Sequence, residues 1–110
     1  MAEPTIQEIF GAGAAQTATT ITILKSDLPM TADATNGGER VFAAICKKAG
    51  TFLTPEAFNT NPDQSISIAQ GFDSLTYRTI ANVQSTYLQT ALSINFAKLQ
   101  ASGGITPDDY

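Results

Sequence analysis

STYLQTALSINFAKL, from Ser85 to Leu99, is the most clearly periodic stretch of this 110-residue chain. Successive side chains of a strand point to opposite faces, so apolar or part-apolar residues at every second position predict a strand with one buried face. At about 3.3 Å per residue the stretch spans roughly 50 Å, which exceeds most globular strands. We therefore expect a bend near Thr90-Ala91 or an extension beyond the body of the domain. The alternating residues are Leu88, Thr90, Leu92, Ile94 and Phe96.

A second pattern predicts one amphipathic helix that ends near Leu53. Asn36 stands three residues before Glu39, which is the spacing of a capping box. Thr54-Pro55 ends the helix, because the residue before a proline disfavours helical backbone, and Thr54 is suited to cap one further turn. The apolar stripe of the helix comprises Val41, Phe42, Ile45, Cys46, Ala49, Phe52 and Leu53.

The remaining strands are shorter. We expect strands at 17–24 and 65–68, a break at Gly71, a strand at 73–78 and a turn at 80–82. The order strand-helix-strand-strand-strand predicts an α+β fold, with one helix packed on a small, mainly antiparallel sheet. Helix and long strand should then share a seam, with four of its side chains nearly fully buried: Phe42, Ile45, Leu92 and Ile94.

Apolar residues near both ends lie beyond glycine-containing joints, which predicts an N-terminal arm (1–16), a compact α+β domain (17–100) and a C-terminal tail (101–110). The first three apolar residues have helical spacing, and two interpretations stay open: a short helix packed on the domain, or an arm docked on a neighbour. We expect the arms to be flexible and to supply the residues that contact partners. The candidate contact residues are Ile6, Ile9, Phe10, Ile105 and Tyr110.

Composition limits the classes of partner. Charged residues make up 15% of the chain, against about 25% in typical proteins. A weakly charged surface suits burial against other subunits, although it also suits a poorly soluble monomer. The six basic residues are scattered and the net charge is −4, which argues against direct nucleic-acid binding. Without an apolar run of eighteen residues or a basic-then-apolar leader, we expect neither a membrane span nor secretion.

The sequence offers no catalytic constellation. It contains no histidine, the commonest general base and a usual zinc ligand. Its one cysteine, Cys46, lies on the apolar helix stripe and is expected to pack there, since a catalytic thiol needs an electropositive, accessible setting. Asp108-Asp109 fall short of a calcium site, which needs six or more oxygens. We expect no catalytic, cofactor-binding or metal-binding residue, and a protein that is not an enzyme.

Four segments, in the same order, resemble a family of short virion-type proteins from cyanobacterial phages and prophages. No functional motif accompanies the resemblance, so it assigns no role to any single residue. The segments cover roughly half the chain: QEIFGAGAAQTATTITILKSDLP (7–29), GGERVFAAI (37–45), NTNPDQSISIAQGF (59–72) and TPDDY (106–110).

The resemblance implies a virion structural protein that is made in the host cytoplasm. A capsid decoration, or cement, protein fits best, with the major capsid protein or copies of itself as partners and a homo-oligomeric arrangement within the assembly. A neck, head–tail connector or tail-terminator subunit is the alternative. A cellular adaptor or small-ligand-binding module remains a second alternative.

Overall fold

The computed structural model describes residues 3–98 and 103–110, so Leu99 and the junction between the predicted domain and tail lie outside the described residues. The fold is mixed α+β, as predicted, but its architecture differs from the prediction. Among the described residues, three α-helices replace the single helix, and two separate two-stranded antiparallel sheets replace the single sheet. In chain order the elements are α1 (Ile6–Phe10), β1 (Ala15–Gln16), β2 (Ile21–Thr22), the 3₁₀ turn η1 (Lys25–Asp27), α2 (Gly38–Phe52), α3 (Pro55–Thr60), β3 (Ile66–Ile80), β4 (Val83–Phe96) and the 3₁₀ turn η2 (Pro107–Asp109).

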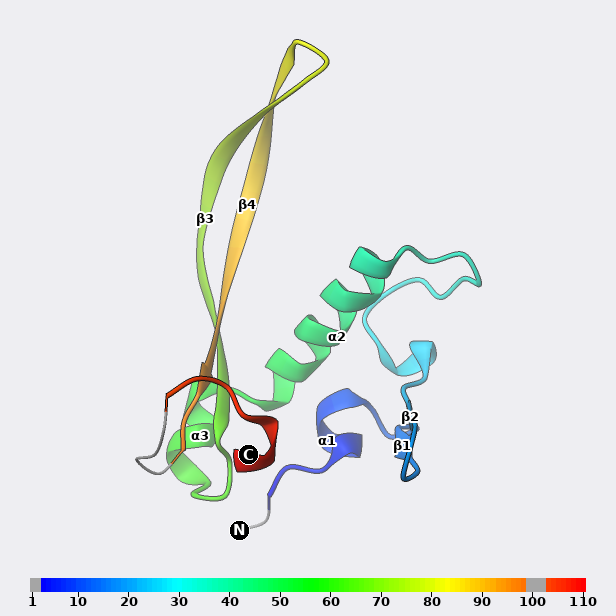
Figure 1. Cartoon of the computed structure of the whole chain (residues 1–110), viewed down its shortest axis with the longest axis vertical. Helices are drawn as coiled ribbons and strands as arrows, with labels where there is room; N and C mark the ends of the chain where they lie inside the picture. The colour runs from blue at the N-terminus through cyan, green and yellow to red at the C-terminus, as the bar shows by residue number, and fades with distance from the viewer. Residues whose placement is uncertain (1–2, 99–102) are drawn as a thin grey trace.

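Strands β3 and β4 form one long hairpin that projects from the rest of the chain (Figure 1). The molecule measures 53 × 35 × 25 Å, and its radius of gyration of 16.9 Å exceeds the value of about 13 Å expected for a compact chain of this length. The predicted extension beyond the domain body is confirmed. We call this hairpin the ribbon and the helices and loops beneath it the base.

The ribbon is closed by the turn predicted at 80–82. Ala81 and Asn82 have φ values of 51° and 64°, as a two-residue hairpin turn of type I′ requires. Strand β3 is continuous, so the break predicted at Gly71 is wrong. A register shift between Gln70 and Asp73 takes its place, opposite the predicted bend near Ala91. Gly71 permits the close approach, because a Cβ there would lie 3.1 Å from the Cβ of Ala91.

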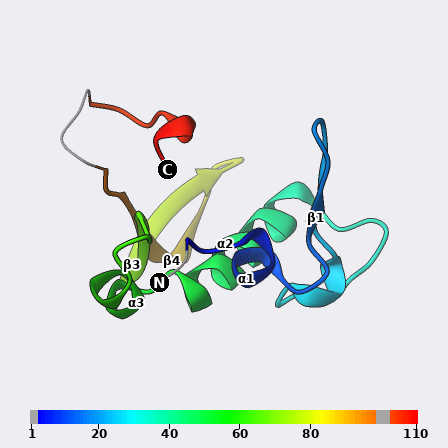
Figure 2. The same cartoon turned by 90° about the horizontal axis from the view of Figure 1, so that it is seen from below.

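The base contains a small hydrophobic core where α1, the C-terminal end of α2 and the start of β3 meet. Ala49, Leu53 and Ile68 are buried there, with Ile9, Phe52 and Ile66 packed around them. The α2 helix closely matches its prediction, and Thr54 caps α3 as expected, since its Oγ1 accepts a hydrogen bond from Ala57 N at 3.1 Å. In Figure 2, α2 lies in the middle: the ribbon and α3 are on one side of it, and β1 and β2 are on the other.

The strand predicted at 17–24 is instead part of a very short hairpin. Ala15 and Gln16 pair with Thr22 and Ile21, and residues 17–20 form the turn between them. The Thr17 Oγ1 accepts a hydrogen bond from the backbone N–H of Thr20 at 3.0 Å. Threonine side chains that bond to nearby backbone favour turns over strands, which outweighs the β-branched composition here.

The predicted capping box of α2 does not form. Gly37 is the residue before the helix, and Asn36 bonds backward into the loop: its Oδ1 accepts from Asp33 N at 2.8 Å. Asp33 in turn accepts hydrogen bonds from the Thr35 backbone and hydroxyl. These bonds, the backbone one foremost, lower the pKa of the exposed Asp33 carboxyl. The polar residues of this loop therefore bond to one another rather than to the helix.

The predicted helix–strand seam is wrong in its extent. Phe42 is 67% exposed, Leu92 43% and Ile94 40%, and Ile45 is only half-buried. The reason is geometric, because α2 meets the ribbon near its own C-terminal end and then diverges from it (Figure 1). A single helix therefore covers only the lower part of the ribbon.

Candidate interaction surface

The ribbon carries one apolar face along most of its length. Residues paired across the strands share a face, and this face runs from the pair Ile66–Phe96 at the base, past the pair Leu75–Leu88, to Tyr77. Near the base this face meets α2 and is partly covered, whereas farther out it lies in water, with Leu88 68% exposed. We call it the apolar face of the ribbon; its residues are Ile66, Ile68, Leu75, Tyr77, Leu88, Leu92, Ile94 and Phe96.

A groove of about 240 Å³ lies where α2 and the ribbon diverge. Its walls include Cys46 and Gly50 of α2, with Ile68 and Leu92 of the ribbon. Phe42, one turn before Cys46 on the same side of the helix, extends the apolar surface outward. The groove therefore adjoins the lower part of the apolar face. Gln70, Asp73 and Thr90 lie on the same face and separate this part from Leu75 and Leu88 farther out.

Further apolar side chains are exposed outside this face. Phe72, at the register shift, is 94% exposed, and Ile80 and Val83 are exposed beside the turn at the tip. An exposed phenylalanine on a bulge is a geometry suited to insertion into a partner's pocket.

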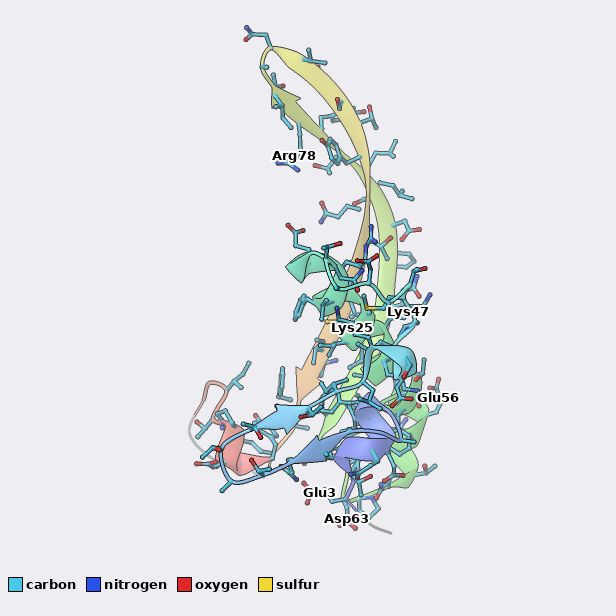
Figure 3. The ribbon with its side chains drawn as sticks, turned by 90° about the vertical axis from the view of Figure 1, so that its right-hand side faces the viewer. Glu3, Lys25, Lys47, Glu56, Asp63 and Arg78 are labelled. Carbon is cyan, nitrogen blue, oxygen red and sulfur yellow. The ribbon has the colours of Figure 1, made fainter. Side chains whose placement is uncertain are left out.

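Charge is nearly absent from the ribbon. Only Asp73 and Arg78 are charged in β3, none is charged in β4, and Arg78 lies over the ring of Tyr87 at 5.2 Å. Figure 3 shows Arg78 near the far end of the ribbon, while the acidic residues Glu3 and Asp63 lie at the base. A partner of the ribbon would therefore be recognised mainly by apolar contact and backbone hydrogen bonding.

The N-terminal candidate residues lie on α1, which packs against α2. Thr5 and Glu8 form a capping box at its start, with N–H···O distances of 3.2 and 3.1 Å. The structure thus has the short packed helix, one of the two interpretations left open by the sequence. Ile6, Ile9 and Phe10 are each partly buried, and Ile9 contacts the core.

The C-terminal candidate residues differ from each other. Tyr110 packs edge-on against Phe96, with ring centroids 5.5 Å apart, whereas Ile105 is exposed. Lys98 fixes the segment by an ion pair with Asp109 at 3.0 Å. The segment 103–110 therefore folds back on the base end of β4, and Ile105 is the candidate left most accessible.

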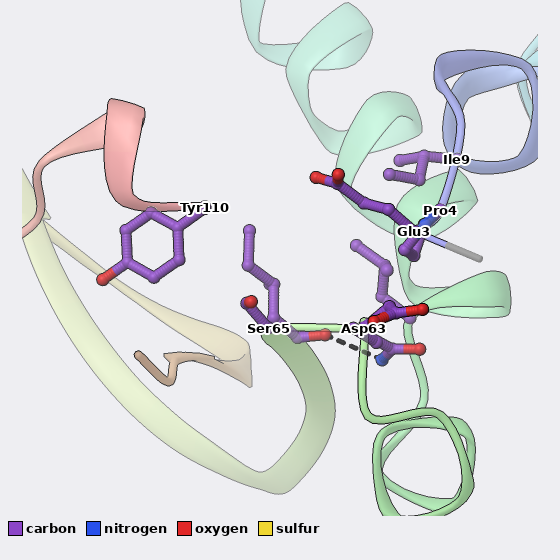
Figure 4. Close-up of a pocket in the computed structure, with 9 residues that line it drawn as sticks. Glu3, Pro4, Ile9, Asp63, Ser65 and Tyr110 are labelled. Carbon is purple, nitrogen blue, oxygen red and sulfur yellow. Dashed lines mark hydrogen bonds between the residues drawn. The ribbon is translucent and has the colours of Figure 1, made fainter. Parts of the chain in front are cut away.

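A small cavity of about 70 Å³ lies in the base, between the N-terminal segment and the start of β3 (Figure 4). Gln64, 3% exposed, lines it and donates from Nε2 to the carbonyl oxygens of Thr54 and Ile66. Its Oε1 has no hydrogen-bond partner among the residues described. Through these two bonds Gln64 joins Thr54, the residue that caps α3, to the start of β3.

The chemistry-bearing residues do not gather into a catalytic or metal centre in the described part of the chain. No group of three metal-ligating side chains occurs within residues 3–98 and 103–110. Cys46 is partly buried at the groove. No helix among these residues is long and apolar enough to cross a membrane.

Comparison with protein-family models, with curated proteins and with solved structures found no match to this chain.

Proposed function

We propose that this protein is a non-enzymatic structural subunit of a phage particle, in which it stabilises the capsid shell as a decoration, or cement, protein. The observation that carries the proposal is the apolar face of the ribbon, most of which a free subunit leaves in water. A two-stranded hairpin is only marginally stable by itself in water. A partner that covers this face would stabilise the ribbon and bind the subunit at the same time.

The shape of the subunit supports a clamping role. Its ribbon extends far enough from the base to reach across a boundary between neighbouring subunits (Figure 1). Large contiguous apolar patches on soluble proteins mark interaction sites, and a specific interface needs about 800 Å² from each partner. The apolar face and the groove together bring apolar side chains of α2 and the ribbon to one side of the molecule, several of them exposed.

Stabilisation of a shell requires no reaction. Modest contacts repeated many times hold an assembly through multivalency. In the assembled particle, a neighbouring subunit would cover α2 and the ribbon's apolar face together. It would bury the residues that the sequence predicts to be buried between helix and strand. The terminal segments 1–16 and 101–110 would add contacts with neighbours, with the exposed Ile105 as the first residue to substitute.

The test compares phage particles with and without the protein. Particles lacking it should assemble, yet release their genome at lower temperature or under milder osmotic shock, and added purified protein should restore resistance. Two neighbouring substitutions provide a matched pair, since Leu88 lies on the apolar face and Gln89 on the opposite face of the same strand. Leu88→Asp should fail to restore resistance, whereas Gln89→Asp should succeed.

Two results would assign another function. Unchanged heat and osmotic resistance, with a defect in joining heads to tails, would contradict the cement role and favour a neck or connector subunit. Absence of the protein from purified particles would contradict both roles and favour a cellular adaptor.

A further inference from the structure

The outer edge of β4 presents a row of unpaired backbone groups. Among residues 3–98 and 103–110, β4 pairs with β3 alone. The pair Ile80–Val83 flanks the two-residue turn, so odd-numbered residues of β4 bond inward to β3, and Ala97 N continues this pattern with a 2.8 Å bond to Ser65 O. The N–H and C=O groups of the even-numbered residues therefore point away from β3.

The two edges of the ribbon differ in their protection against further pairing. Soluble proteins discourage pairing at a sheet edge with charges, prolines and bulges. The β3 edge has such devices in Asp73, Arg78 and the register shift at 70–73. The fourteen residues of β4, VQSTYLQTALSINF, contain no charged residue, proline or glycine. This edge therefore has no such device against a partner strand, and only its base end lies beside the segment 103–110, where Tyr110 packs against Phe96.

We propose that a second copy of this chain pairs with this edge, β4 against β4, antiparallel and with its two-fold axis at Thr90. Even-numbered residues then oppose even-numbered residues, which keeps both apolar faces on one side of a four-stranded sheet. Leu88 of each copy lies opposite Leu92 of the other, and cross-strand apolar pairs of this kind stabilise a sheet. Because β4 is uncharged, no like charges meet across the interface.

The antiparallel arrangement also fits the shape of the subunit. The ribbon projects from one end of the base (Figure 1), so antiparallel pairing places the two bases at opposite ends of the new sheet. Parallel pairing would bring both bases to the same end. This inference is independent of the proposed role in a phage particle, because it needs only a second copy of the chain.

The test exploits the fact that position 90 faces itself across the axis. Asp73 pairs with position 90 inside each subunit, so the variants are made in an Asp73→Asn background. Thr90→Lys and Thr90→Glu should then each be monomeric in sedimentation experiments, because like charges stand directly opposite across the axis. An equimolar mixture should restore the dimer as a heterodimer. Gln84→Lys is the matched control: it lies on the same face of β4 but far from the axis, and it should dimerise alone.

Spin labels on single cysteines, in a Cys46→Ala background, measure the register. Labels at Thr90→Cys should be close, since directly opposed residues have Cα atoms about 5.5 Å apart. Labels at Gln84→Cys should be about 40 Å apart, because twelve residues separate position 84 from its counterpart.

Three results would overturn the proposal: a monomeric wild-type protein, close labels at both positions, or no heterodimer in the mixture of the two charge variants. If the wild-type protein dimerises as proposed but does not bind phage particles, the cement role is contradicted and the dimer proposal is not.

Discussion

The base and the ribbon contain similar apolar side chains, but those of the base are buried and most of those of the ribbon are exposed. In the base, Leu53 and Ala49 are buried against Ile68, whereas in the ribbon Leu75 and Leu88 lie opposite each other in water. The base brings helices over a sheet and so creates an interior, while the outer ribbon has two strands and no covering layer. The core therefore stabilises the base from within the subunit, and we expect the ribbon to gain stability only when another molecule covers it.

The largest effect expected from this contrast comes from a matched pair of leucines. Leu53→Ala should destabilise the isolated subunit by about 2–5 kcal/mol, because it leaves a cavity in a small core. Measured on a monomeric variant, Leu88→Ala should change the free energy of unfolding by less than about 0.5 kcal/mol, because the side chain is in water in the single subunit. Urea denaturation of both variants measures the difference. Equal losses would mean that the ribbon's apolar face is already covered in the isolated protein.

A smaller effect should appear at the tip of the ribbon. Ala81 has a positive φ of 51°, which costs a residue with a Cβ about 1–2 kcal/mol. Glycine relieves this strain but loses more backbone entropy on folding, so Ala81→Gly should stabilise the ribbon by about 0.5–1 kcal/mol. Hydrogen exchange of the β3–β4 amides provides the measurement, with α2 amides as the internal control. Slower exchange confined to the ribbon is expected, and faster exchange there would refute the strain argument.

The smallest effect is the pH dependence of the loop before α2. The pKa of Asp33 is lowered in the folded protein, chiefly by its hydrogen bond from the Thr35 backbone. Its contribution to stability is therefore fully present above the unfolded pKa, near 3.8, and is lost as the pH falls through the folded value. NMR titration should show the lowered pKa, and Thr35→Pro, which removes the donor N–H, should return it toward 3.8. An unchanged pKa in that variant would mean that other groups hold the carboxylate.

The sequence predicted the elements whose signals are local. The helix at α2, the cap at Thr54 and the turn at 80–82 follow from apolar periodicity, proline and turn-forming residues that act within a few positions. The length of the Ser85–Leu99 pattern also predicted a strand that extends past the body. The prediction of a strand at 17–24 is wrong because the Thr17 hydroxyl accepts a hydrogen bond from the Thr20 N–H and favours a turn, a competition that composition does not reveal.

Burial could not be predicted in the same way. Alternation in β4 identifies an apolar face, but the same pattern occurs whether a helix of the same chain or another molecule covers it. The pattern therefore predicts an internal seam that contains Phe42, Leu92 and Ile94. In the structure α2 points away from the ribbon, and all three side chains are exposed. The sequence likewise does not show that β4 is an edge strand, because that depends on which strands pair with it in the folded chain.

The turn at Ala81-Asn82 has a consequence for the timing of assembly. It joins strands that are adjacent in the chain, and hairpins of this kind form in about 1–10 μs. Two proteins at about 1 μM meet productively only every 0.1–10 s or so, given typical association rate constants. A ribbon that frays and reforms would thus do so thousands of times between encounters. Subunit concentration, rather than the ordering of the ribbon, should then set the pace at which this protein joins its partners.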